Sequence, residues 1–334
     1  MHIPENYLSP ATCAVFTVAV VAVIKHAITR AKQVLPPEKL ALLGIAAAFS
    51  FVAMMFNIPL PGGTTGHATC GVLIAILFGP WPATLAVSMT LAIQAFLFRD
   101  GGILSLAANC FNMAFILPHV GYAIYKRACA GSDNLGRELA AAAIGSYVGI
   151  NTAALACALE LGIQPMLFHD AAGQALYCPY PISVSVPAMM AGHLSVWGVA
   201  EATFTVGILA FVRKVAPDFS ALGSASSTEE DNKRIATWPF SLLGALIALC
   251  PLGLIAEGDA WGEWSVDTLQ ELIGFAPSGI TNGWEWTAFV PDYAFGNLPD
   301  IVGYILSAVI GTALLVLFFR LVAKAQKPKV SFEQ

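Results

Sequence analysis

Long apolar stretches, repeated along the whole chain, restrict this sequence more than any other feature. A helix that crosses the hydrocarbon of a bilayer needs about 20 mostly apolar residues, and nine stretches approach or reach that length. Only 11% of the 334 residues are charged and 57% are hydrophobic, far from the balance of a soluble domain. The stretches are 11–29, 40–58, 68–78, 82–98, 103–125, 138–163, 186–212, 238–256 and 301–322. They predict an all-α polytopic membrane protein.

The basic residues are sorted in a way that predicts the direction of the chain in the membrane. If the N-terminus lies outside, fifteen of the sixteen Lys and Arg residues fall in inside loops and only Arg99 falls outside, as the positive-inside tendency requires. A large soluble helical protein, the alternative, has no reason for this sorting. The same direction places the acidic loop 257–300 outside, where its carboxylates either attract cations or only keep the loop soluble.

A change of composition divides the chain in two. Residues 216–237 are polar, Ser-rich and charged, and predict a flexible cytoplasmic linker. Residues 1–215 then form a seven-helix bundle with its N-terminus outside. Residues 238–334 form a two-helix hairpin with a long outer loop and a cytoplasmic C-terminus.

The first two residues are suited to chelate a metal. The free amine of Met1 and the peptide nitrogen of His2 close a five-membered ring around a metal, and that peptide nitrogen and His2 Nδ1 close a six-membered ring. The three nitrogens are nearly coplanar. Because the peptide proton must be lost, we expect binding to weaken as the pH falls.

The loop PLPGGTTGHATCG, residues 59–71, supplies the fourth nitrogen in this hypothesis. Its Pro and Gly residues forbid a continuing helix, and irregular backbone between two apolar segments survives at membrane depth only inside protein or water. His67 of this loop would complete a square-planar site, the geometry that favours Ni(II) or Cu(II) over tetrahedral Zn(II). The N-terminal decapeptide must then fold back to meet His67.

Other polar residues in the apolar stretches have two readings each. His193 is either a neutral histidine bonded to a neighbouring carbonyl or a residue that orients His67. Asn109 and Asn112 lie three apart and are expected to bond across to another helix rather than to touch the metal. Glu160 and Glu201 are expected to be helix-end or inter-helix partners, or steps on an ion path.

Two further expectations concern the loop 99–104 and catalysis. Arg99 and Asp100 are expected to pair with each other or to face solvent. The chain has no Walker A loop, no H-E-x-x-H and no G-x-S-x-G, so we expect no ATP site and no enzyme. If transport is driven, a partner must supply the energy.

Four ordered motifs resemble the CbiM/NikM family, the substrate-specific membrane components of energy-coupling-factor (ECF) transporters for nickel and cobalt. They are MHIPENYL, PLPGGTTGHATCGVL, RDGGILSLAANCFNMAF and GHLSVWGVAEATFT. The segments TLQELIGFAPSGI and VPDYAFG look like a fused NikN/CbiN component, as in NikMN proteins, although APSGI stands where that component has a PDGLE-like signature. Asn6 stands where the family commonly has glycine.

The resemblance implies Met1, His2 and His67 as metal ligands, with Ni(II) or Co(II) as the transported substrate. It also implies a location in the bacterial cytoplasmic (inner) membrane, a transmembrane coupling (T) subunit and cytoplasmic ATPases as partners, and no nucleic acid. The NikN-like hairpin favours nickel. A cobalt importer that feeds cobalamin synthesis and a membrane metal sensor that does not transport stay open as alternatives.

Overall fold

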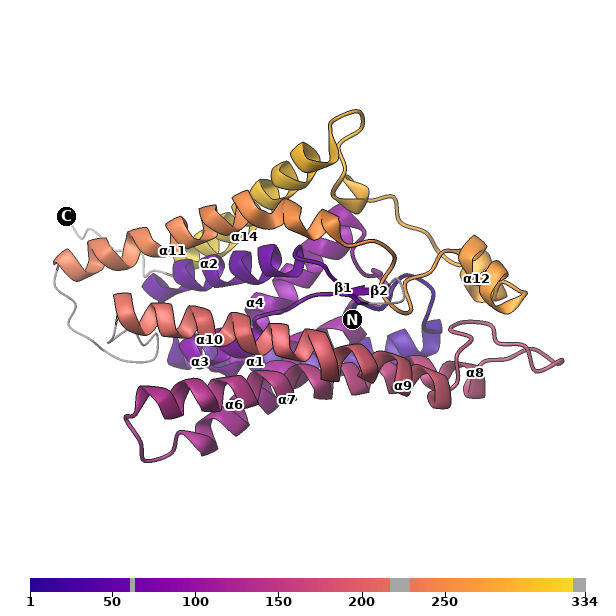
Figure 1. Ribbon diagram of the computed structural model, residues 1–334, viewed down its shortest axis with the longest axis horizontal. Helices are drawn as coiled ribbons and strands as arrows, with labels where there is room; N and C mark the ends of the chain where they lie inside the picture. The colour runs from indigo at the N-terminus through magenta and orange to yellow at the C-terminus, as the bar shows by residue number, and fades with distance from the viewer. Residues whose placement is uncertain (61–63, 217–228, 327–334) are drawn as a thin grey trace, which may run out of the picture.

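The computed structural model describes residues 1–60, 64–216 and 229–326, except for the side chains of Glu38 and of residues 229–237, and it is mainly helical (Figure 1). Three short helical segments are π-helices: η1, η2 and η3. The first half contains, in chain order, α1 (Pro10–Val34), α2 (Pro37–Met54), β1 (Ile58–Leu60), β2 (Thr64–Gly66), α3 (Gly71–Phe78), α4 (Pro80–Ile93), η1 (Gln94–Phe98), α5 (Leu106–Asn109), η2 (Cys110–Ile116), α6 (Leu117–Ala128), α7 (Leu135–Gly162), α8 (Gln164–Leu167), α9 (Ile182–Gly192), η3 (His193–Trp197) and α10 (Gly198–Val215).

The second half consists of two long helices and the loop that joins them. The loop has little regular structure beyond short helical turns. The elements are α11 (Glu229–Leu249), η4 (Cys250–Ile255), α12 (Val266–Ile273), α13 (Ser278–Thr281), η5 (Pro291–Tyr293) and α14 (Asp300–Gln326). In Figure 1 α12 lies at the same end of the molecule as α8.

Each of the nine apolar stretches coincides with helical structure, so the predicted all-α fold class is confirmed. In the described part of the chain, six helical stretches are long and apolar enough to cross a membrane: Pro10–Val34, Pro80–Phe98, Leu135–Leu167, Ile182–Val215, Trp238–Ile255 and Asp300–Gln326. The stretch predicted at 68–78 instead follows the β1–β2 hairpin as the eight-residue α3, about 12 Å long. The exact number of crossings in the first half and their direction stay predictions.

The predicted linker is only partly described. Residues 217–228 lie outside the described part of the chain. Residues 229–237, which the composition assigned to the linker, form the first turns of α11. The apolar stretch beginning at Trp238 therefore continues a helix that has already begun in polar sequence.

Many large apolar side chains face outward, as a membrane-spanning protein requires. Val15, Val18 and Val21 of α1 are 63–74% exposed, and Ile301 and Leu317 of α14 are more than half exposed. A soluble monomer rarely exposes so continuous an apolar surface. The lipid bilayer is the solvent that this surface fits.

The two halves pack against each other through α2 and α14. Gly44 of α2 lies directly under Phe319 of α14, where an added Cβ would come within 2.8 Å of the Phe319 Cβ. On the same interface Tyr304 of α14 donates a 2.7 Å hydrogen bond to the carbonyl of Met55. The C-terminal half is thus part of the same packed body as the bundle.

Candidate metal-capture site

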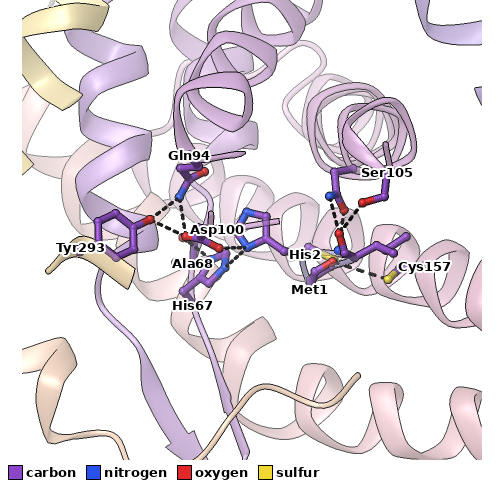
Figure 2. Close-up of polar contacts among 11 residues, drawn as sticks. Met1, His2, His67, Ala68, Gln94, Asp100, Ser105, Cys157 and Tyr293 are labelled. Carbon is purple, nitrogen blue, oxygen red and sulfur yellow. Dashed lines mark hydrogen bonds and ion pairs between the residues drawn. The ribbon is translucent and has the colours of Figure 1, made fainter. Parts of the chain in front are cut away.

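The N-terminal segment is folded into the bundle rather than left in solvent. Met1 is 6% exposed, His2 4% and Ile3 0%. The backbone of Ile3 is bound on both sides by Asn109, whose Oδ1 accepts from the Ile3 N–H at 2.7 Å and whose Nδ2 donates to the Ile3 carbonyl at 3.0 Å. Ser105 Oγ also donates to that carbonyl, at 2.6 Å (Figure 2). The fold-back that a chelate site needs is therefore present.

The loop after η1 completes this binding of the N-terminal segment. The carboxylate of Glu5 accepts hydrogen bonds from the N–H groups of Ile103 and Leu104, at 2.6 and 3.1 Å. The N–H of Gly102 donates to the Ile3 carbonyl at 3.0 Å. Residues 99–104 and the N-terminal segment therefore form one hydrogen-bonded unit.

His2 and His67 face each other. His67 Nε2 lies 3.3 Å from His2 Nδ1, and the ring centroids are 5.0 Å apart (Figure 2). His67 Nδ1 lies 3.3 Å from the Ala68 carbonyl, so a proton on Nδ1 can donate to that carbonyl and leave the lone pair on Nε2. In this tautomer the nitrogen that faces His2 is the one able to bind a metal.

Asp100 is the residue that the sequence analysis missed. It was expected to pair with Arg99 or to face solvent; instead its Oδ1 lies 2.9 Å from His2 Nδ1. Its Oδ2 accepts from Gln94 Nε2 at 3.1 Å and from the hydroxyl of Tyr293. The expectation was wrong because it considered only neighbours in sequence, whereas the N-terminal segment folds directly onto this loop.

Burial and neighbouring charges set the protonation of the site. Burial, and then the nearby His2 and N-terminal amine, hold the pKa of His67 well below the ordinary histidine value. Burial alone would raise the pKa of Asp100, but the interaction with His2 outweighs it and lowers that pKa well below its usual range. At neutral pH the site therefore offers a neutral His67 beside an ionised carboxylate.

Two residues of the fourth motif hold the His67 loop. The Glu201 carboxylate accepts hydrogen bonds from the N–H groups of Thr69 and Cys70 and from the Thr69 hydroxyl, so it caps the N-terminus of α3. Trp197 Nε1 donates to the Ile58 carbonyl at 3.0 Å, and its ring lies against Gly66. Of the alternatives for Glu201, a helix-end or inter-helix partner agrees with these contacts.

The remaining predicted residues lie around the site without meeting its imidazoles. His193 Nδ1 bonds the Met189 carbonyl one turn earlier, at 2.8 Å, and the ring lies edge-on to Trp197. Asn112 donates to Glu160 of α7 at 2.8 Å. His193 is thus bonded to a neighbouring carbonyl and Asn112 to another helix, which agrees with one expectation for each. Asn109, which was also expected to bond to another helix, binds the N-terminal segment instead.

Two nitrogens of His2 have no protein partner. Within residues 1–60, 64–216 and 229–326, the buried Nε2 lacks a hydrogen bond, and the peptide N–H of His2 donates none. Nor do these residues include a cluster of three or more His, Cys, Asp or Glu side chains placed to hold a metal. A site here would have to use main-chain nitrogen together with the two imidazoles.

The loop between α11 and α14 contacts the N-terminal segment. Asn6 Nδ2 donates to the Trp284 carbonyl at 2.9 Å, and the Tyr7 hydroxyl donates to the Trp264 carbonyl at 2.7 Å. The N–H of Val290 donates to the Leu97 carbonyl at 2.8 Å. The second half therefore contributes to the surroundings of the site.

Comparison with known proteins matches each half of the chain to a described family. The cobalt uptake substrate-specific transmembrane region, CbiM, matches residues 2–219, and the PDGLE domain matches residues 236–327. The resemblance of the C-terminal hairpin to the NikN/CbiN component is thereby confirmed, although its signature is altered to APSGI.

Full-length relatives share both halves. The chain is 45% identical to a probable fused nickel transport protein LarMN of Lactiplantibacillus plantarum, over 96% of this chain and 97% of that protein. It is 44% identical to a fused nickel transport protein NikMN of Rhodobacter capsulatus, over 95% of each. The crystal structure of a transition metal transporter, 49% identical, matches with a TM-score of 0.61 over 65% of this chain and 95% of that one. The chain belongs to the CbiM family with a fused PDGLE domain, and is a membrane component of nickel or cobalt transport rather than an enzyme.

Proposed function

We propose that this protein is the metal-capturing subunit of an ATP-driven, ECF-type nickel importer. In this proposal Met1, His2 and His67 hold Ni(II) in a square-planar site of four nitrogens: the Met1 amine, the His2 peptide nitrogen, His2 Nδ1 and His67 Nε2. The observation that carries the proposal is the 3.3 Å approach of the two imidazole nitrogens within a buried N-terminal segment.

The metal would take the place of a proton. His2 Nδ1 lies within hydrogen-bond distance of both Asp100 Oδ1 and His67 Nε2, so a metal bound there would replace any proton that these atoms share. The Met1 amine and the His2 peptide nitrogen must each also release a proton to become donors, and among the described residues none accepts a hydrogen bond from that peptide nitrogen. Planar nitrogen donors favour Ni(II) over Zn(II) or Mg(II).

The energy for transport must come from other chains. This sequence has no Walker A loop, so we propose a transmembrane T subunit and cytoplasmic ATPases as partners. The location is the bacterial cytoplasmic membrane, with the N-terminus and the site outside and the C-terminus inside, which the sorting of the basic residues supports.

The test is equilibrium Ni(II) binding by purified protein with its native N-terminus. One extra N-terminal residue, which removes the Met1 amine from the chelate, and His67→Ala should each abolish high-affinity binding. His169→Ala, a change at an exposed loop histidine, is the matched control and should leave binding unchanged. Full affinity in both the extended and the His67→Ala proteins would refute the site.

Cobalt is the second candidate substrate, because the matched family is described as a cobalt uptake region. Competition between Ni(II) and Co(II) at the purified protein separates the two. Uptake separates an importer from a sensor that does not transport. Cells that express the chain with its T subunit and ATPases should accumulate radioactive nickel if the protein is an importer subunit, and should not if it is a sensor.

A further inference from the structure

A chain of hydrogen bonds runs from the fused C-terminal half to the proposed metal ligand His2. The Tyr293 hydroxyl donates to Asp100 Oδ2, and Asp100 Oδ1 meets His2 Nδ1 at 2.9 Å. Gln94 Nε2 binds the same Asp100 oxygen at 3.1 Å and lies 3.4 Å from the Tyr293 hydroxyl (Figure 2). Asp100 is therefore held on one oxygen by Tyr293 and Gln94, and its other oxygen holds the imidazole.

Tyr293 is itself held firmly. It is buried, and its ring stacks on Phe98 with centroids 4.7 Å apart. Its carbonyl accepts from Ser307 Oγ at 3.0 Å. Both Asp292 and Tyr293 have positive φ, 56° and 60°, a conformation that is unfavourable for a non-glycine residue and persists only where the surroundings impose it. This unfavourable backbone lies at the residue whose hydroxyl contacts Asp100.

We propose that Tyr293 is a positioning residue for metal capture: through Asp100 it holds the His2 imidazole toward His67. The proposal rests on the four-nitrogen site proposed above. Before metal binds, the chain fixes a ring that could otherwise rotate. Because the metal would occupy His2 Nδ1, the Asp100–His2 contact orients the ring only until the metal arrives. The carboxylate of Asp100 would then lie next to a bound cation, which an opposite charge stabilises.

The central comparison is Tyr293→Phe against Tyr304→Phe in the full-length protein with its native N-terminus. Tyr293→Phe removes the hydroxyl and keeps the ring on Phe98. Tyr304→Phe removes a buried hydroxyl of the same half that binds the Met55 carbonyl instead. With Ni(II) alone as the probe, we expect Tyr293→Phe to weaken affinity roughly tenfold, as is typical for partners behind a metal ligand, and Tyr304→Phe to leave it unchanged. Equal effects of the two changes would overturn the proposal.

A double-mutant cycle tests whether Tyr293 acts through Asp100. Asp100→Asn should weaken Ni(II) binding, and adding Tyr293→Phe should then cost nothing more, because the shared path is already broken. Fully additive losses would contradict the proposed path. The ligand-field absorption of bound Ni(II) should be the same in both single variants and the original protein, since the four nitrogens are unchanged. An altered spectrum in Asp100→Asn would make Asp100 a ligand and overturn its positioning role.

His67→Ala in the same series separates the two proposals. If His67→Ala keeps full affinity, the four-nitrogen site itself is wrong. If His67→Ala abolishes binding while Tyr293→Phe binds as the original protein does, the site stands and only the role of Tyr293 fails.

Discussion

At the scale of single residues, Asn6 combines a left-handed backbone with a hydrogen bond to the C-terminal half. Its φ is 64°, in the region that glycine adopts freely and asparagine adopts more readily than most residues. The asparagine side chain donates to the Trp284 carbonyl of the C-terminal loop, and Gly283 lies directly against it. Asn6 therefore adopts a turn that glycine would also allow, and adds a hydrogen bond to the fused half.

Replacing Asn6 with alanine or glycine separates these two effects. Glycine keeps the left-handed conformation and loses only the bond to Trp284. Alanine loses the bond and adds about 1–2 kcal/mol of backbone strain, so Asn6→Ala should lower the thermal unfolding midpoint clearly more than Asn6→Gly. Equal midpoints for the two variants would show that the left-handed backbone at Asn6 does not limit which residue this position accepts.

The buried His67 makes the site dependent on pH. The pKa of His67 lies below the ordinary value of 6.5, so between the two values the unfolded chain binds a proton there that the folded chain does not. The stability contribution of His67 is therefore lost as the pH falls from about 6.5 toward the folded pKa.

Metal binding should weaken in the same direction. Every proposed donor must be free of a proton, so Ni(II) competes with protons for the site. Titrations with Ni(II) at a series of pH values should give affinities that fall steadily from neutral to acidic pH. An affinity independent of pH would contradict a site that includes the deprotonated peptide nitrogen of His2.

At the scale of elements, the β1–β2 hairpin carries His67 and is held by the helical stretch of η3 and α10. The π-helical turn η3 contains Trp197, and the first turn of α10 contains Glu201. Trp197 packs on the hairpin and Glu201 caps α3. The motif GHLSVWGVAEATFT therefore serves to place the His67 loop from both sides, and its histidine bonds within its own helix.

Gly66 is a point of close packing in this arrangement. An added Cβ would lie 2.4 Å from Trp197 Cε2, so Gly66→Ala must displace the hairpin or the indole, and with it the neighbouring His67. We expect Gly66→Ala to weaken Ni(II) binding at least tenfold, about 1.4 kcal/mol. Gly207→Ala in α10, where an added Cβ meets nothing within 4 Å, is the control and should bind normally. Normal binding by both variants would mean that the hairpin tolerates the shift.

At the scale of the whole molecule, the fused C-terminal half is part of the structure that surrounds the site. Its helix α14 packs on α2 (Figure 1), and the loop between α11 and α14 contacts the N-terminal segment at the carbonyls of Trp264 and Trp284. The two regions that match separate families therefore meet both at the long apolar helices and around the candidate metal site.

Gly44 tests the helix contact. Gly44→Ala would bring two Cβ atoms within 2.8 Å, with the backbone of α14 close behind, so α14 must move away from α2. Overpacking of this kind costs about 1–3 kcal/mol, and the thermal unfolding midpoint in detergent should fall. Gly244→Ala in α11, where there is open space, should leave the midpoint unchanged. If both variants unfold alike, the α2–α14 contact contributes little to stability.

The sequence by itself determined the fold class and the candidate ligands. Apolar stretches long enough to cross a bilayer can be recognised without knowing what they touch, and the chelating ability of Met1 and His2 depends on covalent geometry alone. His67 followed from its place in a loop that cannot be helical. The family resemblance depended on the same local motifs.

Only the tertiary structure decided which residues surround those ligands. Asp100 lies 98 positions from His2, Tyr293 193 positions from Asp100, and Glu201 132 positions from Thr69. A buried polar group must find a partner, but which partner it finds depends on how distant segments pack. Reasoning from neighbours therefore assigned Asp100 to Arg99 or solvent and overlooked Tyr293, because only the folded chain brings the loop 99–104, the N-terminus and the C-terminal half together.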